Sequence, residues 1–158
     1  MFEDVVDVLI YLYENYMDGE TPPPTDPNEL KDELTQAGFS GGEVDKALLW
    51  LDELAERIGD TDQAPHAPHA IRIYTDDERG RLDTASRGLL LFLEQNGILD
   101  PVSRELVIER ALALETDSLT VEELKWIVLL VLMNRPGRED AFTQMEDMVY
   151  NATPDLLH

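Results

Sequence analysis

At the centre of the expected core lies Trp126-Ile127-Val128-Leu129-Leu130-Val131-Leu132-Met133, the longest uninterrupted apolar stretch of the chain. The stretch covers every side of a helix, so we expect this helix to be buried all round rather than along one stripe. The helix begins with the capping box Thr120-x-x-Glu123 and ends before Pro136-Gly137. A membrane span needs about 18 or more apolar residues, so the stretch predicts a core helix and not a transmembrane one.

Amphipathic helices with capping signals are expected on both sides of this stretch. The first places Val5, Leu9, Leu12 and Tyr16 on one stripe of a 3.6-residue period. Most of the others begin after a Ser, Thr or Asp that can cap the first turn. The expected helices cover residues 2–17, 27–37, 41–58, 76–96, 101–114, 120–134 and 138–151.

One segment alternates with period two and predicts a strand, Ile71-Arg72-Ile73-Tyr74. Because a strand needs a partner, we expect a short β-hairpin, or wing, formed with part of the linker at 59–70. Three helices followed by a wing match the outline of a winged helix-turn-helix over residues 1–75. The expected fold is therefore mainly α. It has a winged-helix-like three-helix unit at 1–75, packed with a C-terminal four-helix layer at 76–158 that shares its core.

The charge of the chain restricts its partners. The sequence holds 34 acidic and 12 basic residues, a net charge of −22, although 43% of its residues are hydrophobic. Residues 1–79 carry 20 acidic and 5 basic side chains and are the more negative half. Such a surface repels nucleic acid and anionic membranes and attracts basic protein patches. The alternative is that the charge serves solubility alone.

No pattern in the sequence predicts catalysis or a cofactor. There is no cysteine, no Gly-x-Ser-x-Gly and no phosphate-binding glycine loop, so we expect no enzyme activity, no bound metal and no cofactor. His66 and His69 stand in a proline-containing loop without further ligands and are expected to be exposed. The acidic N-terminus differs from a basic signal peptide, so we expect a cytoplasmic protein.

Three side chains are candidates for contact with a partner. Leu49 lies opposite the apolar stripe of its helix and Trp50 lies at its flank, which favours either burial between helical layers or a docking surface. Leu91 is placed in the same way on the helix at 76–96. Arg87 precedes the apolar turn of that helix, where it can pair with Asp83 or hold an anion.

Several segments over nearly the whole length resemble one bacterial family. They are Met1-Phe2, Val8–Leu12, Ala47–Leu51, Arg72–Thr75, Arg81–Asp83, Arg87–Gln95, Val107–Leu114, Leu124–Val128 and Leu156–His158. Together they resemble the Smg family, a domain of unknown function. The resemblance implies a small, acidic, cytoplasmic bacterial protein, and it supplies no catalytic or binding residues.

We therefore expect a non-enzymatic protein that binds a basic or hydrophobic patch on another protein, or regulates it. The alternative is a nucleic-acid-related regulator, or a DNA mimic, that uses the winged-helix-like unit. Direct nucleic-acid binding is disfavoured because the helix at 41–58 presents acidic side chains where a reader of bases presents Arg, Lys, Asn or Gln. No pattern predicts an oligomeric state.

Overall fold

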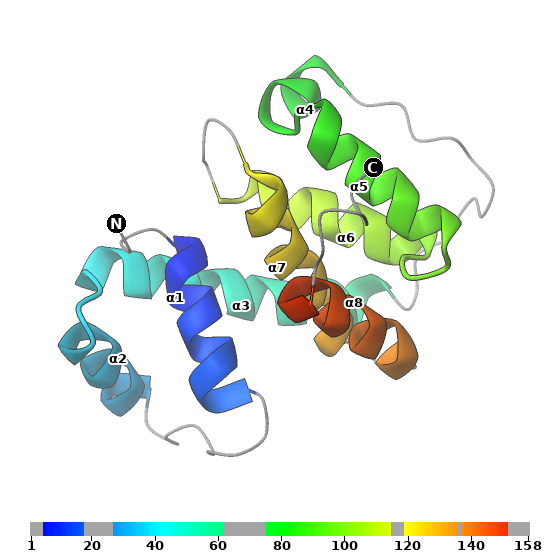
Figure 1. The fold of residues 1–158 in the computed structure, drawn as a ribbon. Coiled ribbons are helices and arrows are strands. Elements are labelled where there is room, and N and C mark those ends of the chain that lie inside the picture. Colours follow the sequence, from blue (N-terminus) through cyan, green and yellow to red (C-terminus); the bar gives the residue numbers. More distant parts are fainter. Residues whose placement is uncertain (1–4, 18–26, 62–74, 115–118, 136, 152–158) are drawn as a thin grey trace. The chain divides into compact units, whose positions relative to one another are not determined.

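The computed structural model describes residues 5–17, 27–61, 75–114, 119–135 and 137–151, and every regular element within them is helical (Figure 1). The mainly α class is therefore confirmed. The elements are α1 (Val5–Leu12), the π-helical turn η1 (Tyr13–Met17), α2 (Pro27–Gln36), α3 (Gly41–Thr61), α4 (Asp76–Arg81), α5 (Thr84–Gln95), α6 (Pro101–Leu112), α7 (Val121–Met133) and α8 (Glu139–Asn151).

The chain forms two compact units, residues 1–53 and 54–158, and the boundary falls within α3. The predicted domains at 1–75 and 76–158, with a shared core, stay a prediction. In unit 1 the buried side chains come from α1, α2 and the first part of α3, among them Val8, Leu34 and Val44. Tyr11 of α1 also packs edge-on against Phe39, with ring centroids 5.5 Å apart.

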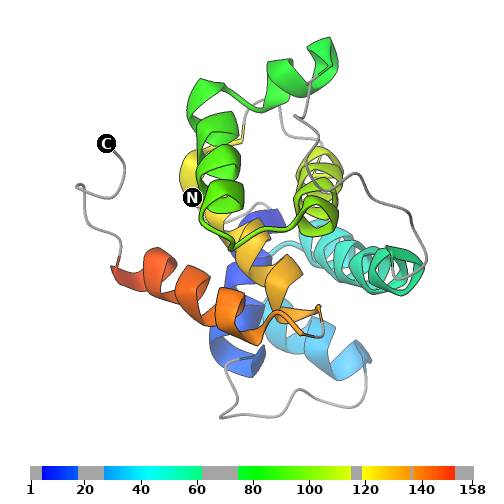
Figure 2. The same cartoon turned by 90° about the vertical axis from the view of Figure 1, so that its right-hand side faces the viewer.

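Unit 2 is built around α7, which packs against α5, α6 and α8 (Figures 1 and 2). The side chains from Ile127 to Leu132 are all fully or almost fully buried, so the prediction of a central helix without an exposed face is confirmed. The capping box is present as well: Thr120 Oγ1 accepts from the Glu123 amide, and the Thr120 amide donates to Glu123 Oε1, both at 3.1 Å. By contrast, α5 lies at the periphery of this unit in both views.

The helix predicted at 76–96 is two helices, α4 and α5. The break occurs at Leu82 and Asp83, where Asp83 adopts an extended backbone and accepts a hydrogen bond from the Ser86 amide at 2.8 Å. Asp83 thus caps a new helix instead of continuing the first, while Leu82 is fully buried. The apolar period predicts one continuous helix because it does not take into account that the Asp83 side chain binds a backbone amide and starts a new helix.

The predicted β-hairpin is wrong. The described residues contain helices and no strand, and the expected strand at 71–74 lies outside them. A four-residue alternation is not stable as a sheet without a second strand, and the segment that follows it favours a helix. Thr75 caps α4 through a complete capping box with Glu78. The winged-helix-like unit expected at 1–75 depended on this hairpin and is therefore not supported either.

Candidate functional site

Leu49 and Trp50 are neighbours on α3 with opposite environments. The Leu49 side chain is 58% exposed, whereas Trp50 is 3% exposed. Of the two alternatives left by the sequence, Leu49 therefore fits the docking surface and Trp50 fits burial. Whether Leu49 contacts a partner stays a prediction.

The surroundings of Leu49 on α3 are mainly acidic. Asp45, one turn before, and Asp52, one turn after, are both exposed. Asp45 Oδ1 pairs with Lys31 Nζ at 2.8 Å, and Lys46 Nζ lies 3.8 Å from Glu43 Oε1. Lys31 and Lys46 are the only basic residues of unit 1. Each cation near Leu49 is thus accompanied by a carboxylate, and the face remains negative.

A second exposed apolar site lies on α5, at Leu91 and Phe92, which are 56% and 40% exposed. The other exposed residues of this helix are Thr84, Ala85, Gly88 and Gln95, none of which is charged. We call these six residues the neutral stripe. Leu91 was singled out from its position opposite the apolar period. That pattern did not take into account that the exposed residues of this helix are all uncharged.

Arg87 is half-buried beside the neutral stripe and is bound to the chain itself. Its Nε donates to the Leu82 carbonyl at 3.1 Å, and Nη2 donates to Thr84 Oγ1 at 3.4 Å. These contacts hold the guanidinium against the turn between α4 and α5. The structure therefore gives Arg87 a part in the helix break, and its role toward a partner stays a prediction.

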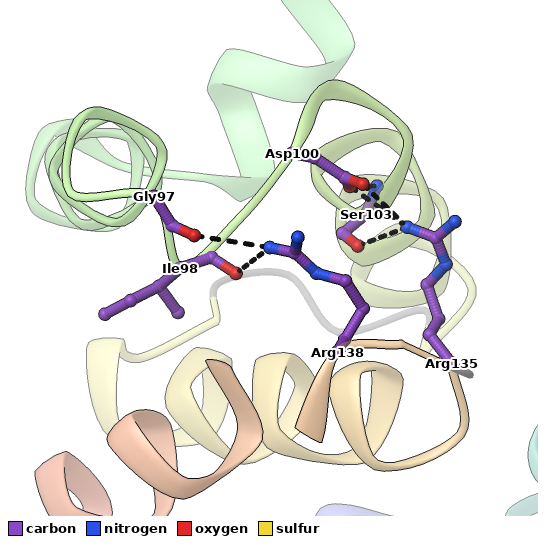
Figure 3. A network of polar contacts seen from close by, with 6 residues as sticks. All are labelled: Gly97, Ile98, Asp100, Ser103, Arg135 and Arg138. Atoms are coloured by element: carbon purple, nitrogen blue, oxygen red, sulfur yellow. Dashed lines mark hydrogen bonds and ion pairs between the residues drawn. The ribbon is translucent and has the colours of Figure 1, made fainter. Parts of the chain in front are cut away.

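A polar network joins the start of α6 to the turn between α7 and α8 (Figure 3). Arg135 Nη1 contacts both carboxylate oxygens of Asp100, at 3.0 and 3.1 Å, and donates to Ser103 Oγ at 2.7 Å. Arg138 Nη2 donates to the carbonyls of Gly97 and Ile98, at 3.3 and 2.8 Å. Asp100 also caps α6 through the Ser103 amide at 2.7 Å.

The electrostatics of Asp100 reflect this network. Burial by itself raises the pKa of the carboxyl group, but hydrogen bonds from Ser103 and the charges of Arg135 and Arg138 outweigh it, so the pKa is lowered. A hollow of about 380 Å³ lies beside the network and is lined by Leu132, Met133, Asn134, Arg135, Glu139 and Phe142. Its two charged residues already bind within the chain, Arg135 to Asp100 and Glu139 to the Gly137 amide, so we assign the network to structure.

Three buried cations of unit 2 also have carboxylate partners. Arg104 pairs with Glu94 at 2.8 Å, Arg110 with Glu109 at 2.6 Å, and Lys125 with Glu122 at 3.2 Å. Burial by itself lowers the pKa of Arg104. The hydrogen bonds and charges of Glu94 and Glu105 outweigh this effect, so the pKa is raised overall and the guanidinium stays charged. These cations are used for packing and ion pairing within unit 2.

The described residues contain neither a candidate metal site nor a candidate membrane span. No group of three or more His, Asp or Glu side chains in these residues could hold a metal ion, and His66 and His69 lie outside them. None of the helices in this part of the chain is long and apolar enough to cross a membrane. The cytoplasmic location expected from the sequence stays a prediction.

The family model described as "Protein of unknown function (DUF494)" matches residues 5–158. The chain is also 48% identical to the "Protein Smg homolog" of Thioalkalivibrio sulfidiphilus over 159 residues, covering 100% of both chains. The chain belongs to the Smg family. The Smg homologue of Nitrosococcus oceani is 46% identical with the same coverage. That of Shewanella woodyi is 48% identical over 96% of this chain and 98% of its own.

The Smg resemblance read from the sequence is thereby confirmed, and it brings no assigned activity with it. No solved structure matches the chain. Sequence reasoning missed the network around Asp100, although Asp100-Pro101-x-Ser103 is a helix-start signature that places one of its members. What could not be read was the pairing with Arg135, which lies 35 residues further along the chain.

Proposed function

We propose that this Smg-family protein acts without catalysis, by binding a basic surface on another protein through the acidic face of α3 around Leu49. The observation that supports the proposal is an exposed leucine set among carboxylates. An exposed leucine alone is ordinary on a protein surface. Leu49 differs because three of its four neighbours one turn away are acidic, Asp45, Asp52 and Glu53. The fourth, Lys46, lies 3.8 Å from a carboxylate oxygen of Glu43.

The charge of unit 1 determines which partners this face attracts. Residues 1–53 hold 14 acidic and two basic residues, and both basic residues have carboxylate partners. The side chain of Asp45 remains 60% exposed although it pairs with Lys31. A field of this sign speeds the approach of a cationic protein and opposes the approach of a polyphosphate. Support is therefore greater for a basic protein surface than for nucleic acid.

Leu49 supplies the apolar part of the contact. Protein interfaces commonly place an apolar anchor at the centre and polar groups at the rim, where water remains. Burying the exposed part of one leucine contributes about 1–2 kcal/mol, which is about tenfold or more in affinity. The acidic rim then contributes specificity and a faster encounter rather than most of the affinity.

Affinity capture with matched leucine variants tests this proposal. The wild type, Leu49→Ala and Leu91→Ala are immobilised, and lysate proteins are captured at about 0.05 M and about 0.5 M salt. We expect a basic protein that is retained by the wild type and by Leu91→Ala at low salt, and that is lost with Leu49→Ala and at high salt. Leu91→Ala is the control because it truncates an equally exposed leucine on another helix.

Two results would contradict the proposal. If Leu49→Ala retains every protein that the wild type retains, Leu49 is not the anchor. If the captured protein is acidic or stays bound at high salt, the negative face of α3 is not what recruits it. Thermal melts of the three proteins show whether each variant is folded.

A further inference from the structure

The neutral stripe of α5 has a shape of its own. Taking about 100° per residue, Thr84, Gly88 and Gln95 lie along its middle, while Leu91 and Phe92 flank Gly88 on either side, one turn further on. The two charged residues of the helix lie off the stripe. Glu94 pairs with Arg104 at 2.8 Å, and Arg87 is bound to the Leu82 carbonyl. The stripe is thus an uncharged face on which Gly88, which has no side chain, lies between two exposed apolar side chains.

Gly88 is not explained by packing within the described part of the chain. A Cβ built at this position meets no atom of the described residues within 4 Å, and its backbone is helical without a positive φ. Glycine weakens a helix relative to alanine, and Gly88 differs from another open helical glycine, Gly59, in lying between two exposed large apolar side chains. A glycine beside exposed apolar residues permits a second helix to approach more closely than any other residue would.

We propose that the neutral stripe is a contact between two copies of this chain, with their α5 helices antiparallel. A twofold axis near the middle of the stripe brings Leu91 and Phe92 of one copy against Gly88 and Ala85 of the other, and the reverse. The same stripe therefore supplies both the apolar side chains and the small residues that face them in the other copy. This self-complementarity is what favours a second copy over a different protein.

Charge limits where two copies of this chain can meet. Each copy carries a net charge of −22, so two copies repel each other over most of their surface. The neutral stripe contains no carboxylate, so contact between two copies through it adds no repulsion from the stripe itself. α5 spans about 18 Å, and a face of this length buries less than the roughly 800 Å² per copy of a stable complex. The dimer is therefore weak, reversible and strengthened by salt, which screens the remaining repulsion.

Sedimentation velocity of the full chain tests the proposal. Samples from about 10 μM to about 1 mM are compared at about 0.05 M and about 0.5 M salt. The apparent mass should rise with concentration from 17.9 kDa toward twice that value, and should rise further at high salt. Leu91→Glu should weaken association at least about tenfold, because it places two carboxylates in the contact. Leu49→Glu, the same change at an equally exposed leucine, should leave association unchanged.

Each other outcome overturns the dimer. A chain that stays at the monomer mass over the whole range does not associate through α5. Association that persists in Leu91→Glu, or that weakens as salt is added, uses a different surface. Because Leu91 is 56% exposed, Leu91→Glu should keep the wild-type circular dichroism and melting temperature, and this is checked on the same samples.

Discussion

Leu49 on α3 and Leu91 on α5 are the same residue type at nearly the same exposure, 58% and 56%, in opposite surroundings. Leu49 has exposed Asp45 and Asp52 one turn away on either side. Leu91 has exposed Gly88 and Gln95 one turn away. The charged residues one turn from Leu91, Arg87 and Glu94, are half-buried and bound within the chain. Exposure alone therefore does not determine what an apolar residue binds. The charge of the exposed residues one turn away separates a face suited to a cationic partner from an uncharged face on which two copies can meet.

The two faces should also respond to salt with opposite sign. Contact between the acidic face and a basic partner is attractive electrostatically, so added salt weakens it. Contact between two negative copies through the neutral stripe is opposed electrostatically, so added salt strengthens it. A protein carrying both surfaces can therefore be shifted from one kind of association to the other by ionic strength alone.

The largest effect on the free energy of unfolding is expected for substitution of Trp50, the neighbour of Leu49, and not for Leu49 itself. Trp50→Ala removes a side chain that is 3% exposed, and should lower the free energy of unfolding by about 3–5 kcal/mol. Leu49→Ala should lower it by less than about 0.5 kcal/mol, because a mostly exposed side chain loses little packing. Urea denaturation of both variants measures the difference. Equal losses would show that Leu49 is part of the core, and the docking surface would lose its anchor.

The next effect concerns the carboxylates around Leu49. Neutralising two of them in Asp45→Asn/Asp52→Asn should weaken capture of the basic partner about tenfold at low salt and flatten its salt dependence, because the attraction is electrostatic. Dimer formation should be unchanged. The control is Asp140→Asn/Asp147→Asn, which removes the same charge at the same spacing from α8. Equal losses in both double variants would mean that net charge, and not the face of α3, attracts the partner.

How much of the fold was readable from sequence depended on whether the signal was local. The all-round apolar pattern at 126–133 and the capping box of Thr120 and Glu123 are properties of one segment, and both predicted α7 correctly. The break at Asp83 was missed because its side chain competes with the continuing helix, and an apolar period does not record that competition. The hairpin was wrong because a strand depends on a partner that one alternating segment cannot supply.

The candidate sites divide in the same way. The sequence placed Leu49 and Leu91 opposite the buried stripe of their helices and left open burial between helical layers or exposure; the structure shows that both are exposed. Trp50 lies about 100° from Leu49, at the edge of the stripe, so its burial depended on packing that sequence does not give. The pairing of Asp100 with Arg135 is set by tertiary structure, because the two residues come from different helical regions.

A smaller effect tests whether unit 2 can be weakened without touching the neutral stripe. Because the pKa of Asp100 is lowered in the folded chain, its charge contributes stability that is fully present above the ordinary value of 3.8. That stability is lost as the pH falls through the lower folded value. Asp100→Asn should therefore cost about 1 kcal/mol at neutral pH, and the cost should vanish in strong acid.

Urea denaturation from neutral pH to about pH 2 measures this difference. Asp52→Asn is the control, since it removes an exposed carboxylate from α3 and should show a smaller difference. Association through α5 should be unchanged by Asp100→Asn at neutral pH. A cost that grows as the pH falls would mean that the charge of Asp100 opposes folding, contrary to its contacts with Arg135 and Ser103.

The smallest effect is expected for Gly88→Ala, which should change the stability of α5 and its contact with another copy in opposite directions. Gly88→Ala should raise the free energy of unfolding of the monomer by about 0.5–1 kcal/mol, because alanine is the better helix former and the added methyl group meets no described atom. The same methyl group would project between Leu91 and Phe92 toward the other copy, so the dimer should become several-fold weaker. Thermal melts of dilute samples and sedimentation of concentrated ones measure the two effects.

Gly59→Ala is the matched control, since Gly59 is an exposed helical glycine of α3 whose added methyl group also meets no described atom. It should stabilise the monomer to a similar extent and leave association unchanged. Gly88→Ala is informative because it should stabilise the monomer and weaken the dimer. A change that only made α5 more rigid would strengthen the monomer and any contact made by α5 together. Stabilisation with weaker association requires that something approaches Gly88 closely, and an unchanged dimer would show that nothing does.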